Sequence, residues 1–254
     1  MRTDITCALG GVSLHELDSR IYVEDIKEDP NDTMETVSRA GYGTFPLTSP
    51  ERDSLVIKVT GYVKERDRIA REAVYQKILG WCTKGWFTKN TRPGQRIYVY
   101  CTKPPGTETY ESARLEIEFT AYGEAYWQDT TPVSVSSSSA VSSATVTLHP
   151  NGTRECFLEA DITPSGGTLT SVSISVGSQV IELSGLSTAA GTVLNIDYTV
   201  DHILRIRSGS SSVLKRRTAD SSDEIILEPG ADNTVELEFN TACNYTIKAR
   251  SLWR

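Results

Sequence analysis

Several features that would announce a known chemistry are missing from this 254-residue sequence. No apolar run approaches the ~20 residues that span a bilayer, so we expect no membrane insertion. The start of the chain lacks the uninterrupted apolar segment of a signal peptide, because Asp4 and the Gly10-Gly11 pair interrupt it. We therefore expect the mature protein to begin at Met1 and to stay on the cytoplasmic side of the export machinery.

Cysteine and histidine are scarce, and neither type is clustered. The five cysteines are Cys7, Cys82, Cys101, Cys156 and Cys243. An odd, scattered set without a CxxC pair indicates neither a disulfide framework nor a zinc site, and predicts reduced thiols packed as small hydrophobes. The histidines His15, His149 and His202 lie in separate segments with no matching carboxylate spacing, so we predict no metal site.

Catalytic motifs are also lacking. There is no GxSxG elbow, no HExxH pair after His15, no Walker loop and no EF-hand. The segment "GYGTFP" (41–46) has no third glycine, and the acidic segment 24–32 is interpreted as a charged strand end rather than a calcium loop. The pairs Glu116/Glu118 and Glu236/Glu238 have the spacing of the solvated face of a strand, and nothing marks them as the paired carboxylates of a glycan-degrading enzyme. We predict no catalytic, cofactor-binding or metal-binding residues, no cofactor and no enzymatic activity.

The negative charge is unevenly distributed. Residues 1–127 hold 17 Lys and Arg against 19 Asp and Glu, whereas residues 128–254 hold 9 against 14. The only dense basic spot is Lys215-Arg216-Arg217. An acidic second half without a basic stripe argues against a dedicated nucleic-acid-binding protein.

The composition is that of a soluble globular protein, with 38% hydrophobic and 23% charged residues, and the length suits two domains. One segment, 66–82, has helical periodicity. Its expected buried face carries Ile69, Ala73, Val74, Ile78 and Trp81 with Cys82. We expect this helix to pack on the sheet of its own domain rather than bind a partner.

Most of the remaining chain has strand periodicity. Segments 20–26, 54–63, 96–101 and 113–122 alternate with period two, and in the last of them Leu115, Ile117 and Phe119 share one face. Nine further segments follow with a turn every eight to twelve residues, namely 144–149, 155–162, 169–176, 179–185, 192–200, 202–208, 224–229, 234–240 and 245–253. That spacing is typical of a β-sandwich.

These patterns predict a mainly β protein of two domains. The first, 1–129, is an antiparallel β-rich domain with one helix, and the second, 144–254, is a sandwich. The Ser/Thr-rich segment 130–143 is predicted to connect them. We expect Val146 and Leu148, in the first strand of the sandwich, to be buried, and Ser136 to Ser139 to be exposed or loosely paired.

The order of these segments resembles the distal tail protein family of long-tailed bacteriophages. The N-terminal similarity lies in "RIYVEDI", "RAGYGTFP", "SLVIKVTGYV", the helix with "ILGWC", "RIYVYC" and "ARLEIEFTAYGEAYW". The C-terminal similarity lies in "HPNGTRECFLEADIT", "VIELSGL", "VLNIDYTV", "LEPGADNTVELEF" and "YTIKARSLW". Together these segments cover most of the chain in order.

The resemblance implies a structural, non-catalytic role at the tail tip of a virion assembled in the host cytoplasm. Members of the family form a ring, typically a hexamer, that joins the tail tube protein to the tail-tip hub. Their second domain is a galectin- or carbohydrate-module-like sandwich that holds a receptor-binding protein in some phages and contacts cell-surface glycans in others. Phage DNA would pass through the ring only as cargo. The ring-interface residues are not implied.

Two other functions compete with this one. A carbohydrate-binding module or host-surface adhesin would act through aromatic side chains exposed on the sandwich. The few aromatics of the second half are Phe157, Tyr198, Phe239, Tyr245 and Trp253, most of them at expected core positions. A glycan-degrading enzyme has no positive support in the sequence.

Overall fold

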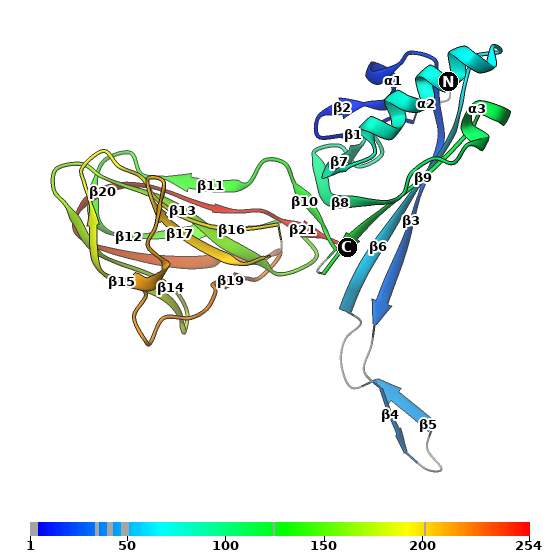
Figure 1. Ribbon diagram of the computed structural model, residues 1–254. Helices are drawn as coiled ribbons and strands as arrows, with labels where there is room; N and C mark the ends of the chain where they lie inside the picture. The colour runs from blue at the N-terminus through cyan, green and yellow to red at the C-terminus, as the bar shows by residue number, and fades with distance from the viewer. Residues whose placement is uncertain (1–4, 34–35, 40–42, 47–50, 124, 201) are drawn as a thin grey trace. The chain divides into compact units, whose positions relative to one another are not determined.

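The computed structural model describes residues 5–33, 36–39, 43–46, 51–123, 125–200 and 202–254 (Figure 1). The chain divides into two compact units, residues 1–127 and 128–254. Both consist mainly of antiparallel strands, which confirms the predicted fold class. Over the ranges described, no helix combines the length and apolar character needed to cross a membrane.

Among the residues that the structure describes, the first unit contains one long helix and two short ones between its strands. Its elements are β1 (Cys7–Leu9), β2 (Val12–Ser13), α1 (Leu14–Leu17), β3 (Ile21–Thr33), β4 (Thr36–Arg39), β5 (Gly43–Pro46), β6 (Glu51–Val63), α2 (Arg68–Trp81), β7 (Lys84–Lys89), β8 (Gln95–Lys103), α3 (Glu108–Ser112) and β9 (Arg114–Tyr122). Strand β10 (Trp127–Asp129) crosses from the first unit to the second.

The main sheet of the first unit has the strand order β2-β1-β7-β8-β9-β6-β3. A single bridge between Ile5 and Val23 joins the chain just before β1 to β3, so the two ends of the sheet meet and the sheet curves around its core. Strand β3 runs through Pro30. Proline is tolerated there because β3 is the last strand in the sheet order and needs fewer ladder hydrogen bonds.

The concave face of this sheet holds the core of the first unit. The predicted inward residues Leu115, Ile117 and Phe119 of β9 are all buried, as expected. They pack with buried residues from β6, β7 and β8, namely Leu55, Ile57, Val59, Phe87, Ile97 and Val99. Burying one such side chain contributes about 1.5–3 kcal/mol.

Helix α2 begins later and buries a narrower face than predicted. Its N-cap is Asp67, whose carboxylate accepts from the backbone N–H groups of Ile69 and Ala70 at 3.4 and 3.0 Å. The buried face starts only at Val74 and continues through Ile78 and Trp81. The prediction was therefore wrong for Ile69 and Ala73, which are exposed because, at about 3.6 residues per turn, they lie away from the face of α2 that carries Val74, Ile78 and Trp81.

Over the ranges that the structure describes, the second unit is a sandwich of strands with one short 3₁₀ turn. Its elements are β11 (Val133–Ser136), β12 (Val141–Leu148), β13 (Cys156–Pro164), β14 (Leu169–Val176), β15 (Gln179–Thr188), β16 (Leu194–Tyr198), β17 (Leu204–Ser208), β18 (Ser211–Ser212), η1 (Leu214–Arg216), β19 (Ile226–Leu227), β20 (Asn233–Ala249) and β21 (Leu252–Trp253).

Strand β20 belongs to both layers of the sandwich. Residues 233–239 pair with β12 on one side and β14 on the other, and β15 extends this first layer. Residues 243–249 pair with β11 and β13, and β16, β17 and β18 extend the second layer. The sequence predicted two separate strands here, 234–240 and 245–253. One continuous strand replaces them, with the change of layer near Thr241.

Half of the Ser/Thr-rich segment 130–143 lies in strands rather than forming a free connector. Residues 133–136 form β11 against β20, and β12 begins at Val141. Pro132 precedes β11 instead of interrupting it, so it costs no ladder hydrogen bond. Val146 and Leu148 are buried as expected, whereas Ser136, Ser138 and Ser139 are exposed.

Candidate interaction surfaces

The residue types that could support catalysis or metal binding are dispersed. His15 lies beside Tyr22, and His202 lies beside Phe157. His149 Nδ1 is 2.8 Å from a carboxylate oxygen of Asp232. Among the residues that the structure describes, no three His, Cys, Asp or Glu side chains come together in a way that could hold a metal ion.

The carboxylate pair Glu116/Glu118 is neutralised by lysines. Glu116 lies 2.8 Å from Lys103 Nζ and 2.9 Å from Lys58 Nζ, and both lysines also approach Glu118. Hydrogen bonds from Lys103 and Lys58 lower the pKa of Glu116 to about 2. A carboxylate held ionised in this way is not suited to donate a proton near neutral pH. The pair is a solvated charge network on the outer face of β9.

All five cysteines are free thiols, and three of them are buried. Burial raises the pKa values of Cys7 and Cys156 to about 12. A thiol with so high a pKa is a poor nucleophile, because the thiolate is the reactive form. These two residues are packed as small hydrophobes.

The outer face of the first unit's sheet carries a row of four aromatic side chains, Trp86, Tyr98, Tyr100 and Tyr122, which we call the aromatic row. Trp86 of β7 lies directly opposite Tyr98 of β8, with ring centroids 5.3 Å apart. Tyr98 to Tyr100 is 5.6 Å, and Tyr100 to Tyr122 is 5.8 Å. The side chains alternate with the buried Phe87, Ile97 and Val99, so the row faces away from the core.

Two cations accompany the aromatic row. The Arg96 guanidinium carbon lies 4.1 Å from the Trp86 ring centroid, and Lys84 Nζ lies 5.9 Å from that of Tyr100. Such contacts are worth about 0.5–1 kcal/mol at exposed sites. Tyr, Trp and Arg are the residue types that are enriched in protein interfaces. The composition and contiguity of the row indicate a protein-contact surface.

A second aromatic pair lies on the outer face at the other side of the sheet. Tyr22 of β3 and Tyr62 of β6 are directly paired and stacked, with centroids 5.3 Å apart, and each is 38% exposed. Lys64 Nζ lies 5.7 Å from the Tyr22 ring. The Lys58–Glu116 network separates this pair from the aromatic row along the strand order β3-β6-β9-β8.

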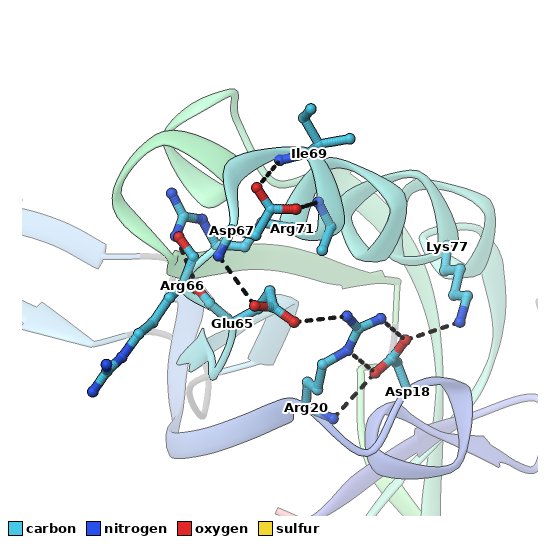
Figure 2. Close-up of polar contacts among 9 residues, drawn as sticks. Asp18, Arg20, Glu65, Arg66, Asp67, Ile69, Arg71 and Lys77 are labelled. Atoms are coloured by element: carbon cyan, nitrogen blue, oxygen red, sulfur yellow. Dashed lines mark hydrogen bonds and ion pairs between the residues drawn. The ribbon is translucent and has the colours of Figure 1, made fainter.

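A network of charged side chains anchors the start of α2 (Figure 2). The buried Asp18 carboxylate accepts from Arg20 Nε and Nη2, each at 2.9 Å, and from Lys77 Nζ at 2.8 Å. Arg20 Nη1 in turn donates to Glu65 at 3.0 Å, and Glu65 accepts from the backbone N–H of Asp67 at 3.1 Å. The hydrogen bonds from Arg20, followed by that from Lys77, hold the pKa of Asp18 below its usual range.

This network presents an isoleucine to solvent. Ile69 lies two residues after the Asp67 cap and is 78% exposed. Figure 2 shows its side chain projecting away from the charged residues. A single exposed apolar side chain is ordinary on a protein surface. Ile69 alone therefore does not define a site.

The aromatic row could have been found from the sequence. In "RIYVYC" (96–101) both polar-face positions, Tyr98 and Tyr100, are aromatic instead of charged. The same alternation that predicts a strand also predicts two aromatic side chains on its outer face. The position of Trp86 opposite Tyr98 could not be found in this way, because β7 was not predicted.

Together the two units define a class of protein, a β-rich domain with one long helix followed by a β-sandwich. No family model matches the sequence, and no curated protein matches it. Solved structures do match its fold. The Dit protein of phage SPP1 is 12% identical in sequence with a TM-score of 0.72, and the match covers 99% of this chain and all of that one. That protein is described as a paradigm of the hub adsorption apparatus in phages that infect Gram-positive bacteria.

Two structures of the phage p2 baseplate in its activated conformation are also similar. The one with strontium has a TM-score of 0.55 at 10% identity, covering 97% of both chains. The one with calcium has a TM-score of 0.52 at 10% identity, covering 99% of this chain and 98% of that one. The chain therefore has the fold of phage distal tail and baseplate proteins over its whole length, as the sequence resemblance led us to expect.

Proposed function

We propose that the chain is a structural component of a phage tail tip, where copies of it form a hexameric ring between the tail tube and the tail-tip hub. The observation that carries this proposal is the whole-chain similarity to the SPP1 Dit protein, which extends over both units in order. A similarity limited to one unit would fit any protein with a related β-rich or sandwich domain. Fold alone does not define function, so the proposal needs a test of assembly.

The aromatic row supports the proposal with a surface for self-association. In a ring, each subunit contacts its neighbour through two different surfaces, so every copy covers the same face of the next. Trp86 and Tyr98, with Arg96 stacked on the indole, form a half-exposed cluster of the residue types that dominate binding energy in interfaces. We assign the aromatic row to the contact with the adjacent subunit.

No catalytic step is part of the proposal. Glu116 is held ionised by two lysines, and the buried thiols of Cys7 and Cys156 are poor nucleophiles. The role is one of assembly. The tail tube protein and the tail-tip hub are the expected axial partners, and a receptor-binding protein is the expected peripheral one.

The oligomeric state tests the proposal. Light scattering combined with negative-stain microscopy of the purified chain should reveal rings, either alone at high concentration or after addition of the tail tube protein. Antibody against the chain should label the tail tip of virions. A chain that stays monomeric under both conditions and is absent from virions would refute a tail-tip role.

A further inference from the structure

Two of the five cysteines lie next to each other in the first unit. Cys82 follows the last residue of α2, and Cys101 lies near the end of β8. Both are half-buried, whereas Cys7, Cys156 and Cys243 are buried. All five lie in the part of the chain that the structure describes. A soluble oxidant can therefore reach Cys82 and Cys101 more readily than the other three thiols.

Backbone pairing brings the two cysteines together. Strands β7 and β8 are antiparallel, with Lys84 directly opposite Tyr100. The Cys101 backbone N–H donates to Thr83 O at 2.9 Å, so the pairing continues one residue beyond β7, next to Cys82. A disulfide needs Cα atoms about 4.4–6.8 Å apart, a range that neighbouring strands offer. No large backbone movement is then needed to join these two residues.

Side-chain packing brings the two thiols to the same side of the sheet. Cys101 lies two residues after the buried Val99, so strand alternation directs its side chain toward the core. Its direct partner on β9 is Phe119, and the ring centroids of Phe119 and Trp81 lie 5.6 Å apart. The end of α2 thus packs over the position of Cys101, and the thiols of Cys82 and Cys101 interact directly.

The interaction makes the two thiols chemically unequal. A hydrogen bond from the Cys82 thiol lowers the pKa of Cys101 against the opposing effect of burial, and the Lys103 backbone N–H adds to this lowering. The same hydrogen bond, together with burial, raises the pKa of Cys82. Because the thiolate is the reactive form, Cys101 is the expected nucleophile of the pair.

We propose that Cys82 and Cys101 form an intramolecular disulfide when the folded chain meets a disulfide oxidant such as oxidised glutathione, and that this bond fastens the end of α2 to β8. The inference goes beyond the function proposed above and does not depend on it. Every residue that it uses lies within the first unit.

The bond would form by thiol–disulfide exchange in two steps. The Cys101 thiolate attacks one sulfur of oxidised glutathione, which gives a mixed disulfide and releases a glutathione thiolate. The mixed disulfide removes the hydrogen bond and the charge of Cys101 that had held the Cys82 proton. Cys82 passes that proton to the released thiolate, attacks Cys101 Sγ and releases the second glutathione. Two protein thiols are oxidised to one disulfide, and one glutathione disulfide is reduced to two thiols.

The disulfide should stabilise the first unit. Helix α2 ends at Cys82 without a left-handed residue in the cap position, since Cys82 has φ −69° and ψ 75°. The bond would close a loop of about 20 residues, 82–101, which restricts the unfolded chain and should raise the thermal unfolding temperature of the first unit by about 10 °C.

The test exposes the reduced, full-length chain to oxidised glutathione, followed by alkylation and non-reducing mass spectrometry. Trypsin places Cys82 in residues 78–84, Cys101 in residues 97–114 and Cys7 in residues 3–20. We expect a disulfide between the first two peptides and an intact mass lower by two hydrogen atoms. Differential scanning calorimetry should show the rise in the unfolding temperature of the first unit and its reversal by dithiothreitol.

Three single variants separate this pair from the other thiols. Cys82→Ala and Cys101→Ala each remove one partner, so neither variant should gain thermal stability from oxidised glutathione. Cys156→Ala removes a thiol of the second unit and is the matched control, which should form the same bond and show the same rise in the first unit. Peptide mapping of the unmodified chain decides the question if a variant fails to fold.

Three results of the mapping would overturn the proposal. They are free thiols at both Cys82 and Cys101 after oxidation, glutathione left on Cys101 without closure of the bond, and a disulfide from either residue to Cys7 or to a second chain. A bond that forms without raising the unfolding temperature would show that it does not fasten α2. None of these results bears on ring formation, which is measured separately.

Discussion

The indole Nε1 of Trp127 donates a hydrogen bond to the carboxylate of Glu28 at 3.2 Å, across 99 positions of sequence. Lys89 and Arg92 both ion-pair with the same carboxylate, and their cationic groups lie 5.4 and 5.2 Å from the Trp127 ring. Burial raises the pKa of Glu28, but the two cations outweigh burial and lower it overall. This cluster fixes the last residue of the first unit against β3.

The cluster predicts a large effect from a nearly isosteric change. Glu28→Gln leaves the Lys89 side chain, only 8% exposed, without its carboxylate, and should lower the stability of the first unit by about 3 kcal/mol. Denaturant unfolding and differential scanning calorimetry should each show this loss of stability. Trp253→Phe is the matched control, because Trp253 donates to Asp129 at 2.8 Å within the second unit. If Glu28→Gln shifted the unfolding transitions of the first and second units equally, the cluster would not belong to the first unit alone.

Asp18 should make the first unit acid-sensitive. Its pKa in the folded chain lies below that in the unfolded chain, about 3.9, so its contribution is fully present above about pH 5 and is lost as the pH falls further. Asp18→Asn should cost roughly 2 kcal/mol at pH 7. The thermal unfolding temperature of this variant should therefore fall less steeply between pH 7 and pH 3 than that of the unmodified chain.

The exposed Asp220 supplies the control for that experiment, as Asp220→Asn should leave the pH profile of the first unit unchanged. The Asp18 assignment fails if Asp18→Asn and the unmodified chain lose stability in parallel between pH 5 and pH 3.

The aromatic row should control assembly without controlling folding. Tyr98→Ser combined with Tyr100→Ser removes two half-exposed rings, and a loss of about 2 kcal/mol of contact energy corresponds to roughly a 30-fold weaker association. Analytical ultracentrifugation should show the ring dissociating at higher protein concentration. Ile203→Ser, at an exposed apolar position of the second unit, should leave association unchanged. Rings of unaltered stability in the tyrosine variant would place the subunit contact elsewhere.

How much could be predicted from the sequence depended on whether a pattern was local. Long alternating segments such as 113–122 were placed within one or two residues, because period-two burial is encoded residue by residue. Helix α1 was missed although Ser13 and Glu16 form a capping box, with Ser13 N–H donating to Glu16 at 2.8 Å and Glu16 N–H to Ser13 at 3.2 Å. That Ser-x-x-Glu signal was readable but stands before only four helical residues.

Other features depend on partners far along the chain. Strand β11 has only Val133 and Val135 as apolar residues, and it forms because residues 246–249 of β20 provide backbone hydrogen-bonding partners for it. The candidate surfaces likewise split into local features and features that depend on distant partners. Both tyrosines of "RIYVYC" were visible in the alternation. By contrast, a small depression lined in part by Thr163, Asn244 and Thr246 exists only through the register of β13 with β20. Register is set by tertiary packing and cannot be read from either strand alone.

The change of layer in β20 should depend on Asn240. Its Oδ1 accepts from the backbone N–H groups of Thr170 and Ser171 at 2.7 and 3.1 Å, and its Nδ2 donates to Thr168 O at 3.2 Å. Asn240→Ala leaves these groups without that partner and should destabilise the second unit by about 2 kcal/mol. Asn240→Asp keeps the acceptor and should cost less. Equal unfolding midpoints for Ala and Asp would show that the accepted hydrogen bonds contribute nothing.

Two glycines should respond in opposite directions to the same substitution. Gly61 of β6 faces a bulge in β3, and a Cβ at this position would lie 2.0 Å from the backbone oxygen of Tyr22. Gly80 of α2 has no atom within 4 Å of the equivalent point. Gly61→Ala must push two paired strands apart and should cost about 3 kcal/mol or more, in the range of severe overpacking. Gly80→Ala should instead stabilise the helix by about 0.5–1 kcal/mol. Urea unfolding of the two variants measures whether each substitution raises or lowers stability. A Gly61→Ala chain as stable as the unmodified one would mean that β3 and β6 do not approach each other closely at this bulge.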